Sequence, residues 1–134
     1  MTTLSDAELR PGIRWGRAIV GGLLLELLLS GFAGLLYGLD RLEDLNTYIL
    51  PATLLAAVLA GAWTARGTAR PVLNGALAGV AALALYVLLA IVAGLLAPDR
   101  ADFTTALSPL YLASHALKVL GGALGGWWVA RKRA

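Results

Sequence analysis

The chain has 134 residues, of which 59% are hydrophobic and 14% are charged, and it contains no cysteine. Soluble domains carry roughly half apolar and a quarter charged residues, and one small core could not enclose this much apolar surface unless lipid covered the rest. The composition therefore excludes an ordinary soluble domain, and the lack of cysteine excludes disulfides, thiolate metal sites and a cysteine nucleophile.

Four apolar runs in chain order predict four membrane-spanning α-helices. They cover residues 17–37, 48–65, 72–97 and 107–130. Each run approaches or exceeds the roughly 20 residues that cross about 30 Å of hydrocarbon. The runs are continuous rather than alternating, which favours helices over the strands of a barrel. The sequence predicts one domain over residues 1–134, an all-α integral membrane bundle of four transmembrane helices.

Proline supports these boundaries. Pro51, Pro71 and Pro109 fall in the first turn of the last three spans, and Pro98 follows the third span. Proline is tolerated in a first turn because its missing N–H has no helical partner there, and it often follows the end of a helix.

The charge distribution predicts that both termini are cytoplasmic, because Lys and Arg near span ends are retained on that side. Basic residues gather before the first span, between the second and third, and after the fourth: Arg10, Arg14, Arg17, Arg66, Arg70, Arg131, Lys132 and Arg133. The other two loops carry only Arg41 and Arg100, among five acids. Tryptophans at the basic ends and tyrosines near the opposite ends fit the aromatic belts of a membrane protein. The expected location is the bacterial inner membrane, crossed several times.

A net charge of +3 does not indicate nucleic-acid binding here, because the basic residues lie beside apolar runs, where anionic lipid headgroups are nearer. Membrane lipids are expected partners, together with further copies of the chain or other membrane proteins. We expect no nucleic-acid partner and no cofactor.

The two helical hairpins resemble each other in sequence. The second span ends GAWTAR at residues 61–66, and the fourth ends GWWVAR at residues 126–131. This pattern indicates a duplicated hairpin with a pseudo-twofold axis along the membrane normal. Membrane helices also reuse few residue types, so chance similarity remains an alternative. Glycine and alanine stripes in the last three spans predict close helix packing, and an unused stripe could serve a homodimer.

One polar centre is predicted inside the bundle. Glu26 lies in the middle of the first span and Lys118 in the middle of the fourth, with His115 one turn away and Tyr86 near the middle of the third. A charge alone in a membrane span costs roughly 2.5 to 3.5 kcal/mol on insertion scales, so a pair is the cheaper arrangement. Helical spacing places each of these charges on a polar face.

Two interpretations of this centre stay open. Glu26, with Lys118, His115 and Tyr86, forms either a proton-responsive or substrate-binding centre of a small transporter, or a buried ion pair that fixes helix register. The single histidine has no second histidine or carboxylate cluster to complete a metal site. No nucleophile elbow, phosphate loop or zinc-protease motif is present, so no catalytic residues and no enzyme activity are predicted.

The chain resembles a family of small bacterial four-helix membrane proteins whose function is uncharacterised. The resemblance rests on residues 65–70 (ARGTAR), 74–79 (NGALAG) and 117–126 (LKVLGGALGG), and on the basic tail. It implies a four-helix fold and an inner-membrane location, and it supplies no activity. The leading functional prediction is a non-enzymatic helix-packing or assembly component.

The chain is also similar in one feature to the small multidrug-resistance exporters, which are short four-helix proteins with a glutamate in the first helix. Glu26 matches that glutamate. Two features depart from that family, namely the strong charge bias between loops and Lys118, which would neutralise the carboxylate. The third span also lacks that family's aromatic residues except Tyr86. A small proton-coupled transporter or exporter using Glu26 is the alternative prediction.

Overall fold

The structure, a computed structural model, describes residues 12–98 and 108–133. Within these ranges it consists of α1 (Trp15–Gly38), a short 3-10 helix η2 (Leu42–Asp44), α2 (Leu45–Ala65), α3 (Pro71–Leu96) and α5 (Pro109–Arg131). The described part contains no strand. The prediction of an all-α protein built from four long helices is confirmed.

Three segments are long and apolar enough to cross a membrane by length and composition: α1, the stretch Leu42–Ala65 that contains α2, and α3. Helix α5 has 23 residues, but Ser114, His115 and Lys118 interrupt its apolar sequence. The chain therefore has several helices of the kind found in membrane proteins.

Helix α2 differs from the prediction at its start. The sequence places this start at residue 48, whereas the helix begins at Leu45, directly after η2. Pro51 consequently lies inside the helix, in its second turn rather than its first. There the proline ring removes the helical hydrogen bond to the carbonyl of Thr47. Pro71 and Pro109 open α3 and α5 as predicted. The predicted start of the last span, residue 107, lies outside the described residues.

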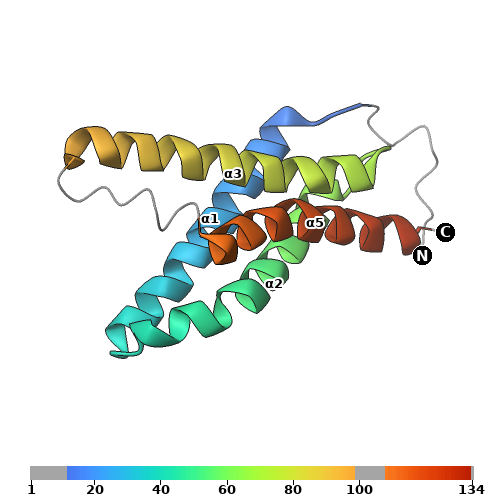
Figure 1. The fold of residues 1–134 in the computed structure, drawn as a ribbon. Coiled ribbons are helices and arrows are strands. Elements are labelled where there is room, and N and C mark those ends of the chain that lie inside the picture. The colour runs from blue at the N-terminus through green and yellow to red at the C-terminus, as the bar shows by residue number, and fades with distance from the viewer. Residues whose placement is uncertain (1–11, 99–107, 134) are drawn as a thin grey trace.

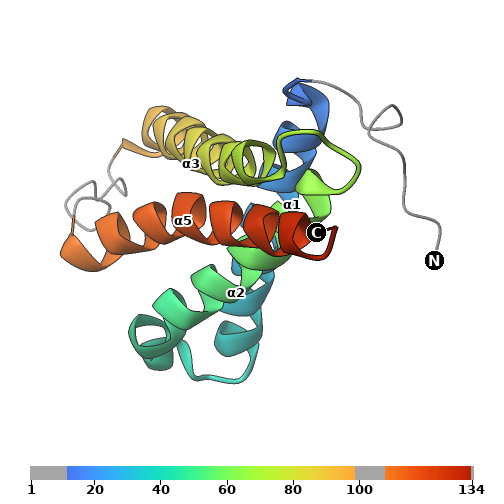
Figure 2. The same cartoon turned by 90° about the vertical axis from the view of Figure 1, so that its right-hand side faces the viewer.

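The helices pack tightly at one end of the bundle and diverge at the other (Figure 1). Helix α5 runs antiparallel to α3 and packs along both α2 and α3, while α1 packs mainly on α3. The hairpin of α1 and α2 leans away, so that η2 and the C-terminal end of α3 are far apart. We call this divergent side the open end. The opposite side, seen nearest the viewer in Figure 2, brings the starts of α1 and α3 near the ends of α2 and α5.

Glycines on two faces of α5 allow this close packing. Gly121 and Gly125 face α2, and Gly122 and Gly126 face α3. A Cβ added to Gly121 would lie 2.7 Å from the Cβ of Ala57, which is closer than side chains pack. Such small residues let helix backbones approach, which drives association where lipid is the solvent. The predicted small-residue stripes of α5 are thus used inside the bundle.

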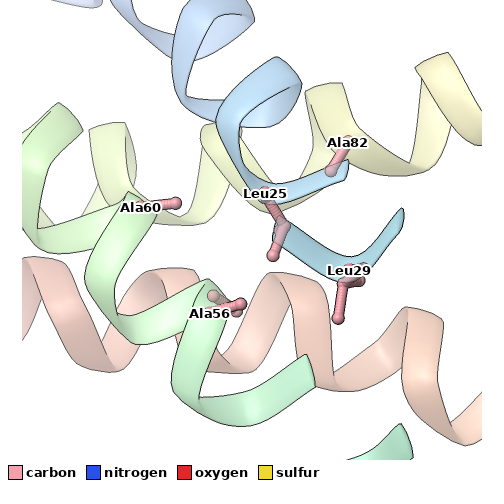
Figure 3. Packing of buried hydrophobic residues seen from close by; sticks show 6 residues of the cluster. Leu25, Leu29, Ala56, Ala60 and Ala82 are labelled. Atoms are coloured by element: carbon pink, nitrogen blue, oxygen red, sulfur yellow. The ribbon is translucent and has the colours of Figure 1, made fainter. Parts of the chain in front are cut away.

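The core is small and rich in alanine (Figure 3). Leu25 and Leu29 of α1 pack against Ala56 and Ala60 of α2 and against Ala82 of α3. Alanines contribute little side-chain volume, so the three backbones lie close together at this level.

The two hairpins are packed unequally. Helix α2 contacts α3, whereas no Cα atom of α1 lies within 8 Å of one in α5. A pseudo-twofold axis relating the hairpins would make these two helix pairs equivalent. The resemblance of the hairpins in sequence is therefore not matched by equivalent packing.

Arginine side chains hold the tight end together. The guanidinium of Arg17 donates to the carbonyl oxygens of Trp63 and Arg66, both at 2.6 Å, and lies 4.8 Å from the centre of the Trp63 ring. Arg133 donates to the carbonyl of Thr68 at 2.8 Å. These bonds reach the carbonyl of Trp63 in the last turn of α2 and two carbonyls of the loop that follows it. The loop between α2 and α3 is fixed from both sides.

Candidate functional site

Glu26 and Lys118 form an ion pair near the middle of the bundle. The Nζ atom of Lys118 lies 2.5 Å from Oε1 of Glu26. Lys118 is almost fully buried, and the Glu26 side chain is 15% exposed. Since the backbones of α1 and α5 do not approach each other, this pair is a direct link between the two helices.

Tyr86 and His115 complete the predicted polar centre. The Nζ atom of Lys118 lies 5.0 Å from the centre of the Tyr86 ring, a cation–π contact from α3. The Tyr86 and His115 rings are 4.5 Å apart between centres and tilted by 52°. The structure thus brings together all four residues that the sequence singles out, from α1, α3 and α5.

The ion pair lies on the wall of a cavity of about 420 Å³. The cavity is formed by all four long helices, where the bundle begins to diverge toward the open end. Its walls are mostly apolar, from Leu29, Leu45, Ile49, Leu89, Ala90 and Ala93. Apolar walls with a few polar groups are typical of small-molecule sites.

Two further polar atoms at the cavity have no hydrogen-bond partner among the residues that the structure describes. Thr53 of α2 is fully buried, and its Oγ1 forms no hydrogen bond within residues 12–98 and 108–133. The same holds within this described part for the buried Nδ1 atom of His115. Both residues line the cavity. Buried polar atoms normally find a partner, because an unpaired one costs about 1–3 kcal/mol.

The sequence interpretation does not single out two polar cavity residues, Ser114 of α5 and Thr53 of α2. Thr53 follows Leu45 and Ile49 at intervals of four, so the three side chains share one face of α2. All three line the cavity. A hydroxyl in the middle of an otherwise apolar face was the available signal.

Ser30 of α1 and Tyr111 of α5 line the cavity beside the ion pair. By helical spacing Ser30 shares a face of α1 with Gly22, and Tyr111 shares a face of α5 with Gly122. These two glycines lie against the backbone of α3. Each face therefore combines polar cavity residues with a close helix contact.

The groups around the cavity can bind a small molecule and exchange protons. They are a carboxylate, an ammonium group, an imidazole and hydroxyls, and among the described residues none is arranged as a nucleophile with its base. No group of three or more His, Asp or Glu side chains that could hold a metal occurs in the part of the chain that the structure describes.

No family model, curated protein or solved structure matches the chain. The resemblances drawn from sequence motifs therefore stay predictions. The geometry of the cavity is the basis for the functional proposal.

Proposed function

We propose that the protein is a non-enzymatic, four-span inner-membrane protein that transports a small molecule, with Glu26 coupling transport to protons. One observation carries this proposal: the Glu26–Lys118 pair borders an open cavity instead of being sealed within packed side chains. An ion pair that only fixes helix register needs no such space. The cavity favours the transporter over the assembly component that the sequence ranks first.

Charge gives the proposed orientation. The tight end carries seven basic residues and no acid within residues 12–18, 63–74 and 127–133. Retention of such residues in the cytoplasm puts both termini inside. The cavity then opens away from the cytoplasm, between α3 and the hairpin of α1 and α2.

Protonation of Glu26 supplies the coupling step. The neutral carboxyl no longer attracts Lys118, and the buried ammonium loses its counter-ion. Other titratable groups facing this pair are Tyr86 of α3 and His115 and Tyr111 of α5. Because the pair is the direct link between α1 and α5, its loss allows α1 to move relative to α5.

A proton-release assay tests this proposal. Membrane vesicles of both orientations, energised with a pH gradient that a fluorescent dye reports, are mixed with decyl amphiphiles that carry hydroxyl, trimethylammonium or sulfonate heads. At least one amphiphile is expected to dissipate the gradient faster with the wild-type protein than with Glu26→Gln. Glu43→Gln, an exposed glutamate of η2, is the matched control and should behave as wild type. Equal responses of Glu26→Gln and wild type to every amphiphile would contradict the proposal.

The helix-packing or assembly component is the second candidate function. It is favoured by the fact that the ion pair joins two helices whose backbones do not approach each other. In this role the protein associates with further copies or with other membrane proteins. Chemical crosslinking at native expression should then give oligomers, and recovery of monomer alone would contradict it.

A further inference from the structure

We infer that the cavity binds an amphiphile whose polar head is uncharged. The head forms hydrogen bonds with Thr53 and His115, and the apolar body lies along the walls toward the open end. This inference rests on the proposed transport function and specifies its substrate class.

The charges at the site already satisfy each other. Lys118 is paired with Glu26 at 2.5 Å, is 3% exposed and has its Nζ atom 5.0 Å from the centre of the Tyr86 ring. A charged head would either break this pair or add net charge to a site of low dielectric, and both are costly. An uncharged head leaves the pair intact.

The unpartnered atoms mark the position of the head. The Oγ1 atom of Thr53 and the Nδ1 atom of His115 border the same cavity from α2 and α5. The hydroxyl of Ser114, another cavity residue, is already bonded to the carbonyl of Tyr111 at 2.9 Å. A hydroxyl, amide or carbonyl head can satisfy a threonine hydroxyl and a neutral imidazole, since both accept and donate.

The cavity walls determine the chemistry of the remaining part of the ligand. Leu29, Ile49, Leu89 and Ala93 surround the cavity with apolar surface from three helices. A cavity of about 420 Å³ falls within the range of small-molecule sites. A body that covers these walls must itself be apolar, which excludes sugars and other polar solutes.

Photoaffinity labelling of the full-length protein in lipid nanodiscs tests this inference. The probes share one diazirine-bearing decyl chain and carry a hydroxyl, a trimethylammonium or a sulfonate head. Labelled residues are mapped by mass spectrometry. The hydroxyl probe is expected to label cavity-wall residues such as Ile49 and Leu89, and the two charged probes to label them far less.

Variants of two threonines of α2 test the position of the head. Thr53→Val should lower cavity labelling by the hydroxyl probe about fivefold, the equivalent of one hydrogen bond. Thr64→Val is the matched control, because Thr64 is equally buried but donates to the carbonyl of Ala60 at 2.8 Å. Thr53→Ser keeps the hydroxyl and should restore labelling.

Each alternative outcome has a distinct meaning. Equal or stronger cavity labelling by a charged probe overturns the substrate class but leaves transport through Glu26 intact. Unchanged labelling of Thr53→Val overturns the assignment of the head. Absence of cavity labelling by all three probes overturns this inference, and transport then depends on the proton-release assay alone.

Discussion

Glu26 and Lys118 remain charged inside an apolar bundle because each is the counter-ion of the other. Either charge alone in a span costs roughly 2.5 to 3.5 kcal/mol on insertion scales. The contact of the Lys118 ammonium with the Tyr86 ring adds a further favourable electrostatic interaction. At the level of single residues, the polar centre is thus stable only when both Glu26 and Lys118 are present.

A double-mutant cycle measures this mutual dependence. Glu26→Gln and Lys118→Met should each lower the free energy of unfolding by about 3 kcal/mol, because each leaves one buried charge unpaired. The double variant should recover most of the loss. The measurement is denaturant unfolding of the detergent-solubilised protein, and simply additive losses would show that the charges do not form a direct pair.

Thr53 and Thr64 should respond oppositely to the same substitution. Thr53→Val removes a buried hydroxyl without a partner, so the free energy of unfolding should stay unchanged or rise by up to about 1 kcal/mol. Thr64→Val removes a hydrogen bond to the Ala60 carbonyl and should lower it by about 1 kcal/mol. Equal losses in the two variants, measured by the same unfolding method, would show that Thr53 has a partner inside the protein.

At the level of helices, α5 is the element on which the bundle is built. Its paired glycines face α2 on one side and α3 on the other, while Lys118 extends across to α1. One helix therefore holds both neighbours by backbone packing and the third helix by a single long side chain. This difference leaves α1 attached to α5 more loosely than α2 is.

Adding a methyl group should lower stability at a closely packed glycine and leave it unchanged, or raise it slightly, at an open one. In Gly122→Ala the new Cβ would overlap the backbone of Gly75 in α3, and the free energy of unfolding should fall by about 1–3 kcal/mol. In Gly34→Ala nothing lies within 4 Å of the new Cβ, so stability should be unchanged or raised by up to about 1 kcal/mol. A neutral Gly122→Ala in the unfolding measurement would contradict the close approach of α5 and α3.

Sequence patterns predict the long helices because apolar runs of this length specify helix strongly. The sequence does not predict the start of α2, because Leu45, Asn46 and Thr47 follow an acidic turn and resemble a loop. In the structure these three residues form the first turn of the helix, directly after η2. The meeting of Glu26, Lys118, His115 and Tyr86 follows from charge cost and helical spacing. The role of Thr53 cannot be predicted in this way, because only the packing shows that its hydroxyl lacks a hydrogen-bond partner among the described residues.

The whole molecule is polarised between a basic tight end and an open end. Arginine hydrogen bonds fix the loop between α2 and α3, whereas α1 and α3 diverge at the other side (Figure 1). The divergence of the helices cannot be read from hydropathy, since all four runs look equally able to pack. The charged residues of the cavity can be identified from the sequence, whereas the cavity itself follows only from the three-dimensional arrangement of the helices.

Single cysteines test the orientation of this polarised molecule, because the chain has no native cysteine. Ala69→Cys lies in the exposed loop at the basic end, and Glu43→Cys lies in the exposed η2 turn. In intact cells a membrane-impermeant maleimide should label Glu43→Cys and spare Ala69→Cys until the membrane is permeabilised, as the distribution of basic residues requires. The reverse pattern would place the cavity on the cytoplasmic side.

The most direct test of the account measures whether protonation of Glu26 moves the open end. Nitroxide labels at Leu39→Cys and Leu95→Cys, which are 59% and 78% exposed, report the separation of the α1–α2 turn from the end of α3. Glu26→Gln keeps the side chain neutral, as protonation would, and should therefore shift the distance distribution relative to the wild type. Glu43→Gln, the matched control, should follow the wild type. A distribution in Glu26→Gln that is identical to that of the wild type would contradict proton coupling through this pair.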